Sequence, residues 1–87
     1  MYRFKAFYKD GTTQIFGTPM DTPNELYFDF DGCMKWEDYY SFYDNDVSTK
    51  DILEVAFKVF KNTLKKEYYR IEIINDETNE IIDYIEK

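Results

Sequence analysis

The sequence predicts one α+β domain, residues 1–87, in which a small antiparallel sheet of about five strands carries one long amphipathic helix packed on one face. Three observations lead to this fold class: strand-like alternation of apolar and polar residues near both ends, an Asp10-Gly11 turn signal, and helix-like spacing of apolar residues after Ser48. A chain of 87 residues leaves no room for a second domain.

The first two strands are predicted to form a hairpin. Apolar residues alternate with charged ones over Tyr2–Tyr8, and only Phe7 breaks the pattern on the polar side. Asp10-Gly11 favours a two-residue type I′ turn, because both of its positions need positive φ. The second strand then covers Thr12–Phe16. The expected register places Lys9 opposite Thr12, Ala6 opposite Ile15, and Lys5 opposite Phe16.

A third strand is predicted after a surface connection over Gly17–Asn24. Pro19 and Pro23 make that connection a poor central strand, because proline cannot donate to a sheet ladder. Residues 26–31 then alternate apolar and mostly polar side chains, and Asp31-Gly32 would stop the strand.

The segment Cys33–Tyr43 fits two structures. Its aromatic residues Trp36, Tyr39, Tyr40 and Tyr43 have helical spacing, yet aromatic density is typical of strands. The preceding turn signal and the poor helix propensity of Tyr, Phe, Ser and Asp favour an extended segment.

A helix is predicted from Thr49 to about Lys66. Ser48 is the expected N-cap, Asp51 is suited to the first turn, and Val47 and Ile52 are spaced as a hydrophobic staple. Apolar residues fill one broad arc of the helix and charged residues fill the other, so one face should pack on the core.

Two final strands are predicted at Tyr68–Asn75 and Ile81–Ile85. Tyr69, Ile71 and Ile73 should share one face of the first, and Ile74 indicates that its other face is partly covered. Asn79 is the candidate for a left-handed turn position. The predicted order is β-β-β-(β or short α)-α-β-β, which several strand arrangements could satisfy.

Composition disfavours several functions. A net charge of −7 repels bare nucleic acid and anionic membranes, and no apolar stretch is long enough for a membrane span or a secretory signal. One cysteine excludes an intrachain disulfide, so a cytoplasmic location is expected. The absence of histidine removes the commonest general base and metal ligand, so we expect a protein that is not an enzyme and uses no cofactor.

Residues 21–46, called the acidic segment below, hold the whole charge imbalance. They contain eight acids against one base, Lys35, whereas acids and bases balance in the remaining chain. Eight aromatic residues accompany these acids, unlike the composition of a disordered acidic tail. Acids on outer faces also keep small proteins soluble, but exposed tyrosines beside acids are typical of interfaces. The predicted partner-binding residues are Asp29, Asp31, Trp36, Glu37, Asp38, Tyr39, Tyr40, Tyr43, Asp44 and Asp46.

Catalytic and metal sites are weaker interpretations of the same residues. The carboxylates at positions 29, 31, 37 and 38 could bind a hard cation, but an EF-hand pattern starting at Asp44 fails at Thr49 and Val55. Cys33 lacks a histidine partner, and Glu37 with Asp38 lacks the deep cleft that sugar chemistry needs. We therefore predict no catalytic or metal residues.

A lysine group at positions 58, 61, 65 and 66 could form a nucleic-acid patch, because residues 55–66 contain no acid. A solvated helix face that complements the helix dipole is the better interpretation, since the group has no arginine and no interleaved aromatic residue.

The overall profile is a short, acidic, Tyr- and Asp-rich domain without histidine. It resembles phage-encoded inhibitors of bacterial defence, including anti-CRISPR proteins and DNA-mimicking anti-restriction proteins. The resemblance implies a basic DNA-binding protein or nuclease complex of the host as partner, in the host cytoplasm, with no direct binding of nucleic acid or membrane. It also implies that the phosphate mimics are Asp29, Asp31, Glu37, Asp38, Asp44 and Asp46. A general acidic interaction module and a small carboxylate metal-dependent enzyme are the alternatives.

Overall fold

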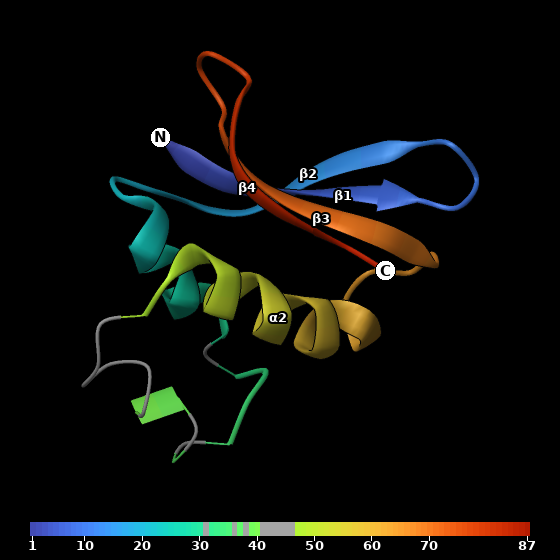
Figure 1. Cartoon of the computed structure of the whole chain (residues 1–87). Helices are drawn as coiled ribbons and strands as arrows, with labels where there is room; N and C mark the ends of the chain where they lie inside the picture. Colours follow the sequence, from blue (N-terminus) through green and yellow to red (C-terminus); the bar gives the residue numbers. More distant parts are fainter. Residues whose placement is uncertain (31, 36, 38, 41–46) are drawn as a thin grey trace.

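The computed structural model describes residues 1–30, 32–35, 37, 39, 40 and 47–87. Its elements form an α+β fold in which a four-stranded antiparallel sheet is covered on one face by helices (Figure 1). The elements are β1 (Tyr2–Tyr8), β2 (Thr13–Met20), the 3-10 helix η1 (Pro23–Phe30), α2 (Thr49–Val59), the 3-10 turn η2 (Phe60–Asn62), β3 (Tyr68–Asn75) and β4 (Glu80–Glu86). The prediction of about five strands and one longer helix is therefore wrong in number and length, although the fold class is confirmed.

The sheet order is β2-β1-β3-β4, and every neighbouring pair is antiparallel. β1 and β3, which are far apart in the sequence, thus meet in the centre, where they pair from Tyr2 to Tyr8. β2 and β4 are the edges. The two predicted hairpins are both present, but only the tertiary structure places them side by side.

The predicted register of the first hairpin is wrong by one residue. Ala6 pairs with Gln14 and Lys5 pairs with Ile15, because the loop contains three residues, Lys9-Asp10-Gly11, rather than two. Gly11 has a φ of 90°, the left-handed position that follows a type I turn in such loops. The Asp10 carboxylate accepts hydrogen bonds from the Thr12 hydroxyl and amide, which lower its pKa to about 2.

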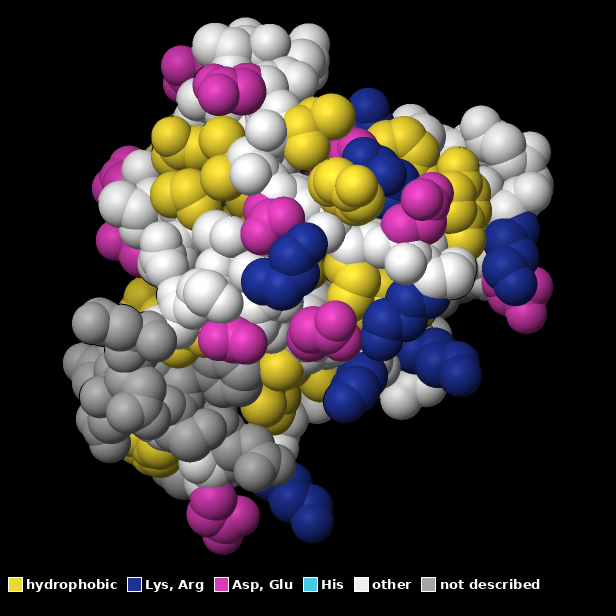
Figure 2. All heavy atoms as spheres, viewed as in Figure 1, with side chains coloured by type: hydrophobic (Ala, Val, Ile, Leu, Met, Phe, Trp, Pro, Cys, Tyr) yellow, Lys and Arg dark blue, Asp and Glu magenta, His cyan; other side chains and the backbone are white. Residues whose placement is uncertain are grey.

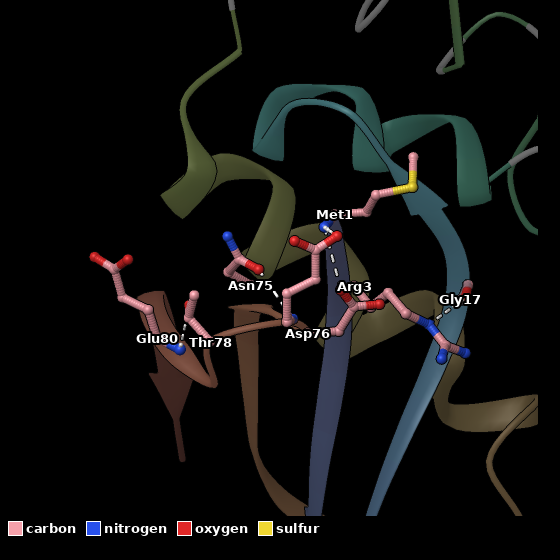
Figure 3. Close-up of polar contacts among 8 residues, drawn as sticks. Met1, Arg3, Gly17, Asn75, Asp76, Thr78 and Glu80 are labelled. Carbon is pink, nitrogen blue, oxygen red and sulfur yellow. Dashed lines mark hydrogen bonds and ion pairs between the residues drawn. The ribbon is translucent and has the colours of Figure 1, made fainter.

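β2 continues through Pro19 to Met20, beyond the predicted strand end. The segment Gly17–Asn24 is therefore not only a connection; Pro19 is tolerated because β2 is an edge strand. The pairing with β1 shifts between Tyr2 and Phe4, and Gly17 in the shifted part has a φ of 90°. In this region the Arg3 side chain reaches across to β2 and donates to the Gly17 carbonyl at 3.0 Å (Figure 3).

The predicted third strand is instead the helix η1. Leu26 and Phe30, four residues apart, are buried, whereas Phe28 between them is exposed. Burial therefore does not alternate along this segment as it would in a strand. The buried residues have the i, i+4 spacing of a helical turn instead. Pro23 stands at the start of η1, where a missing amide hydrogen does no harm.

Four phenylalanines from four elements meet where η1 packs on the sheet. Phe4 of β1 and Phe60 of η2 have ring centroids 5.4 Å apart, Phe16 of β2 lies 5.0 Å from Phe60, and Phe30 of η1 lies 5.7 Å from Phe60. This cluster holds η1 against the same face of the sheet as α2. The start of the acidic segment is thus anchored in the core.

The predicted helix start is confirmed and the predicted helix end is wrong. Ser48 has an extended backbone, and its hydroxyl accepts from the Asp51 amide at 3.1 Å. α2 ends at Val59, and the Phe60 carbonyl then accepts from both the Thr63 and Leu64 amides. The bond from Thr63 is of the 3-10 type, which tightens the last turn at many helix ends. It turns the chain towards β3 well before Lys66.

Both strands of the last hairpin form as predicted, and β4 is one residue longer at each end. Asn79 has a φ of 61°, which confirms its left-handed position, and its amide donates to the Asn75 carbonyl at 2.8 Å. Ile74 is buried, which confirms that the second face of β3 is partly covered. Tyr69 does not share a face with Ile71, because a shift in pairing between β1 and β3 turns its ring towards Phe7.

The preference for an extended Cys33–Tyr43 segment is wrong at three of the positions that the structure describes, whereas Cys33–Lys35 form a turn and an irregular stretch. Glu37, Tyr39 and Tyr40 are helical, and the Tyr39 amide donates to the Lys35 carbonyl at 3.0 Å. The helical spacing of the aromatic residues is the better indicator. The described residues of this segment lie on the side of α2 that faces away from the sheet (Figure 1).

Candidate protein-binding surface

The described part of the acidic segment is built on a row of aromatic rings. Tyr27 of η1 contacts Phe28 with ring centroids 4.3 Å apart and Tyr39 at 6.1 Å, and Tyr39 contacts Tyr40 at 6.3 Å. Tyr27 and Tyr39 pack against the core, whereas Phe28 is 37% and Tyr40 is 45% exposed. The row therefore leads from two half-buried rings to two exposed rings that a partner could contact.

The predicted site residues fall into three groups. Glu37 and Tyr40 are exposed, and Tyr39 is half-buried in the row of rings. Asp29 is half-buried and lies elsewhere, against β2. The other six lie outside the described residues, so their place in the site stays a prediction: Asp31, Trp36, Asp38, Tyr43, Asp44 and Asp46.

Asp29 faces the irregular part of β2 rather than solvent alone. Its Oδ1 accepts from the Thr18 amide at 3.2 Å, and its Oδ2 is buried with no hydrogen-bond partner among the residues that the structure describes. Burial raises the pKa of Asp29, although Thr18 and the nearby Arg3 charge oppose the shift. A side chain at position 17 would collide with this carboxylate, since an ideal Cβ there would stand 2.6 Å from Oδ2. Asp29 thus fixes η1 to β2.

The acidic segment differs from the rest of the molecule in how its acids are paired with cations. Eight acids in the remaining chain lie within 4.0 Å of a cationic nitrogen, among them Asp10, Asp83 and Glu72. None of the acidic segment's described acids does, which are Asp21, Glu25, Asp29 and Glu37. The negative charge of the acidic segment is therefore not neutralised by ion pairs within the described part of the chain.

The ion pairs outside this segment connect elements of the fold. The N-terminal ammonium lies 3.2 Å from Asp76, next to the turn between β3 and β4 (Figure 3). Asp83 of β4 receives Lys50 at 3.0 Å and the Thr49 hydroxyl at 2.8 Å, which ties the start of α2 to the sheet. Asp76 and Asp83 therefore stabilise the fold by joining separate parts of the chain.

Sequence reasoning missed the outer sheet face, the side of the sheet away from α2. Ile15, Ile81 and Tyr84 on this face are all more than a third exposed. The Arg70 guanidinium lies 3.9 Å from the Tyr84 ring centroid, and its Nε donates to the buried Glu72 carboxylate at 2.9 Å. Figure 2 shows hydrophobic side chains interspersed with charged ones over the sheet. Phe7 and Ile74 on the polar side of their strands were the available signals.

Metal and membrane features give no competing site in the described part of the chain. No three His, Cys, Asp or Glu side chains of the described residues gather as metal ligands, and Cys33 is exposed. Among the same residues, no helix has the length and apolarity needed to cross a membrane.

Comparisons with protein-family models, with curated proteins and with solved structures find no match to this chain. The candidate surface therefore has to be interpreted from its own chemistry.

Proposed function

We propose that this protein is a non-enzymatic inhibitor, phage-encoded, that binds a bacterial defence nuclease complex of the CRISPR-Cas or restriction type at its basic DNA groove. The observation that carries the proposal is the separation of charge: the segment with all of the net −7 contains no ion-paired acid among its described residues. A partner lined with Arg and Lys would provide the missing counter-charges.

The surface supports a division of labour between charges and rings. Exposed carboxylates such as Glu37 would steer the encounter and fix the orientation, because electrostatic complementarity acts mainly on association rates. Tyr40 and Phe28 would lose solvent on binding and provide more of the affinity, as aromatic residues do at interface centres. Blocking the groove would then exclude DNA without any chemistry by this protein.

The position of Asp29 modifies the predicted set of phosphate mimics. Its carboxylate already accepts from Thr18 and lies against Gly17, so we assign it a positioning role for η1. Glu37, Tyr39 and Tyr40 remain proposed contacts, together with the predicted residues outside the described ranges.

A general protein-interaction module is the second candidate. It is favoured by the outer sheet face, where Ile15, Ile81 and Tyr84 are exposed although solvent-facing sides of antiparallel sheets are usually polar. A partner of that module would contact the sheet and leave the acidic segment free.

A matched pair of tyrosine variants separates the two candidates. Tyr40 and Tyr84 are both 45% exposed, one in the acidic segment and one on the outer sheet face. A partner captured from bacterial lysate would be identified by mass spectrometry, and its binding to each variant would be measured. Tyr40→Ala should weaken binding by about tenfold, as loss of an interface tyrosine does, and Tyr84→Ala should have no effect. The opposite result would favour the interaction module.

The DNA-groove proposal requires competition with DNA. The purified target should bind this protein or its DNA, but not both, and association should slow steeply with added salt because screening acts within ~8 Å at physiological ionic strength. Glu37→Lys should slow association, whereas Glu80→Lys, an equal change at an exposed acid outside the segment, should not. Simultaneous binding of protein and DNA would refute the proposal.

A further inference from the structure

A hollow of about 500 Å³ lies beside the C-terminal half of α2 and is rimmed by lysines from four parts of the chain. Lys58 comes from α2, Lys61 from η2, Lys65 and Lys66 from the segment before β3, and Lys9 directly follows β1. Glu67 is the only acid among the described residues that line it. Figure 2 shows basic side chains gathered around the end of α2.

Most of this positive charge has no partner in the fold. Lys58, Lys61 and Lys65 form no ion pair with any residue that the structure describes, whereas Lys66 lies 3.0 Å from Asp10 and Lys9 lies 3.9 Å from Glu67. Like charges gathered in one place repel one another, so an anion in the hollow would relieve that repulsion.

The helix dipole does not explain the whole group. A dipole attracts cations only near the last turn of its helix. Lys58 and Lys61 meet that condition, but Lys65 and Lys66 follow the end of η2 at Asn62, and Lys9 belongs to the loop after β1. The backbone hydrogen bond from the Lys9 amide to the Glu67 carbonyl, 2.9 Å long, brings these separate segments together.

The floor of the hollow is apolar and aromatic. Phe57 and Tyr68 are half-buried with ring centroids 4.9 Å apart in an edge-to-face arrangement. The Tyr68 hydroxyl donates to the Phe57 carbonyl, which fixes the ring, and Leu64 is buried beside them. A flat apolar group could therefore lie against the floor while its charged end reaches the lysines.

Size and electrostatics favour a small ligand over a nucleic-acid chain. The volume falls within the range of about 300–1,000 Å³ that is usual for small-molecule sites. A long polyanion would also have to pass the rest of a molecule whose net charge is −7, whereas screening over ~8 Å lets a small anion experience mainly the lysines.

We propose that this hollow binds a small ligand carrying at least two phosphates and a flat aromatic group, the chemistry of a nucleoside di- or triphosphate. The lysines bind the phosphates, and Phe57 with Tyr68 supports the base. No described residue of the acidic segment lines this site, and the proposal does not depend on the inhibitor function proposed above.

The test is a titration of the full chain with ATP. Binding is measured by calorimetry and by changes in the amide chemical shifts of NMR spectra. ATP should bind saturably and at least about fivefold more tightly than inorganic pyrophosphate, because the base adds an aromatic contact, and adenosine alone should not bind. Lys61→Gln should weaken ATP binding by about fivefold, the size expected of one exposed charge pair, and Lys61→Arg should restore it.

Lys35→Gln is the matched control, since it removes one exposed lysine from the acidic segment and should change the affinity by less than about twofold. Lys58→Gln replaces Lys61→Gln if circular dichroism shows that the latter is unfolded. Absence of saturable ATP binding, equal losses in the Lys61 and Lys35 variants, or tighter binding of a single-stranded oligonucleotide than of ATP would each overturn the proposal.

Discussion

Gly17→Ala tests whether η1, and with it the start of the acidic segment, is fixed to β2. Gly17 has a φ of 90°, so alanine would strain the backbone by about 1–2 kcal/mol. Its Cβ would also stand 2.6 Å from Asp29 Oδ2 and 3.4 Å from Phe4 Cδ2. Displacing the Asp29 carboxylate breaks its bond with the Thr18 amide, which adds about 1–2 kcal/mol.

Gly11→Ala is the control, because Gly11 has the same φ of 90° and no atom within 4 Å of the position its Cβ would take. Urea denaturation should therefore show a loss of unfolding free energy of about 1–2 kcal/mol for Gly11→Ala and about 2–4 kcal/mol for Gly17→Ala. Adding Asp29→Ala should recover the part that comes from the collision. Equal losses at the two glycines, or strict additivity of Gly17→Ala and Asp29→Ala, would refute the close approach of η1 to β2.

Three further substitutions test local features. Ser48→Ala should lower the free energy of unfolding in urea by about 1 kcal/mol through loss of the cap, and a loss below a few tenths of a kcal/mol would contradict the helix start. Thr49→Ala should also lower the free energy of unfolding, because the Thr49 hydroxyl donates a hydrogen bond to Asp83. At Asn79, glycine should be neutral or mildly stabilising and valine should destabilise by about 1 kcal/mol or more, so equal thermal midpoints would exclude a left-handed turn residue. Burial raises the pKa of Asp29, so the wild type should lose stability relative to Asp29→Asn as the pH rises from below about 4 through that raised pKa. The free energies of unfolding of the two proteins would be compared across this pH window. A difference that stays constant would argue against a buried carboxylate.

Features that depend on a few neighbouring residues were predictable from the sequence. The Ser48 cap needs only its own hydroxyl and the amide three residues later, and the left-handed turn at Asn79 needs only a side chain that tolerates positive φ. The alternation in β1 indicated a strand for the same reason. The concentration of charge in residues 21–46 is likewise a property of the amino-acid order alone.

Features that depend on distant partners were not predictable. Residues 26–30 alternate like a strand, but Phe30 contacts Phe4 and Phe60 in the core, which buries one side of a helical turn. The first hairpin differs from the expected register by one residue because Gly11, and not the Asp10-Gly11 pair, sets the loop length. α2 ends early because the Phe60 carbonyl takes two amides and the chain turns towards β3.

The candidate sites show the same division. The order of amino acids alone concentrates carboxylates and aromatic rings in the acidic segment and lysines near the end of the helix. The folded arrangement, in contrast, turns Asp29 towards β2 and brings Lys9 to the hollow beside Lys58 and Lys61. It also places Tyr84 and Ile15 on one exposed sheet face. The physical reason is that capping and turn chemistry act over a few bonds, whereas burial and charge pairing depend on which segments the whole fold brings together.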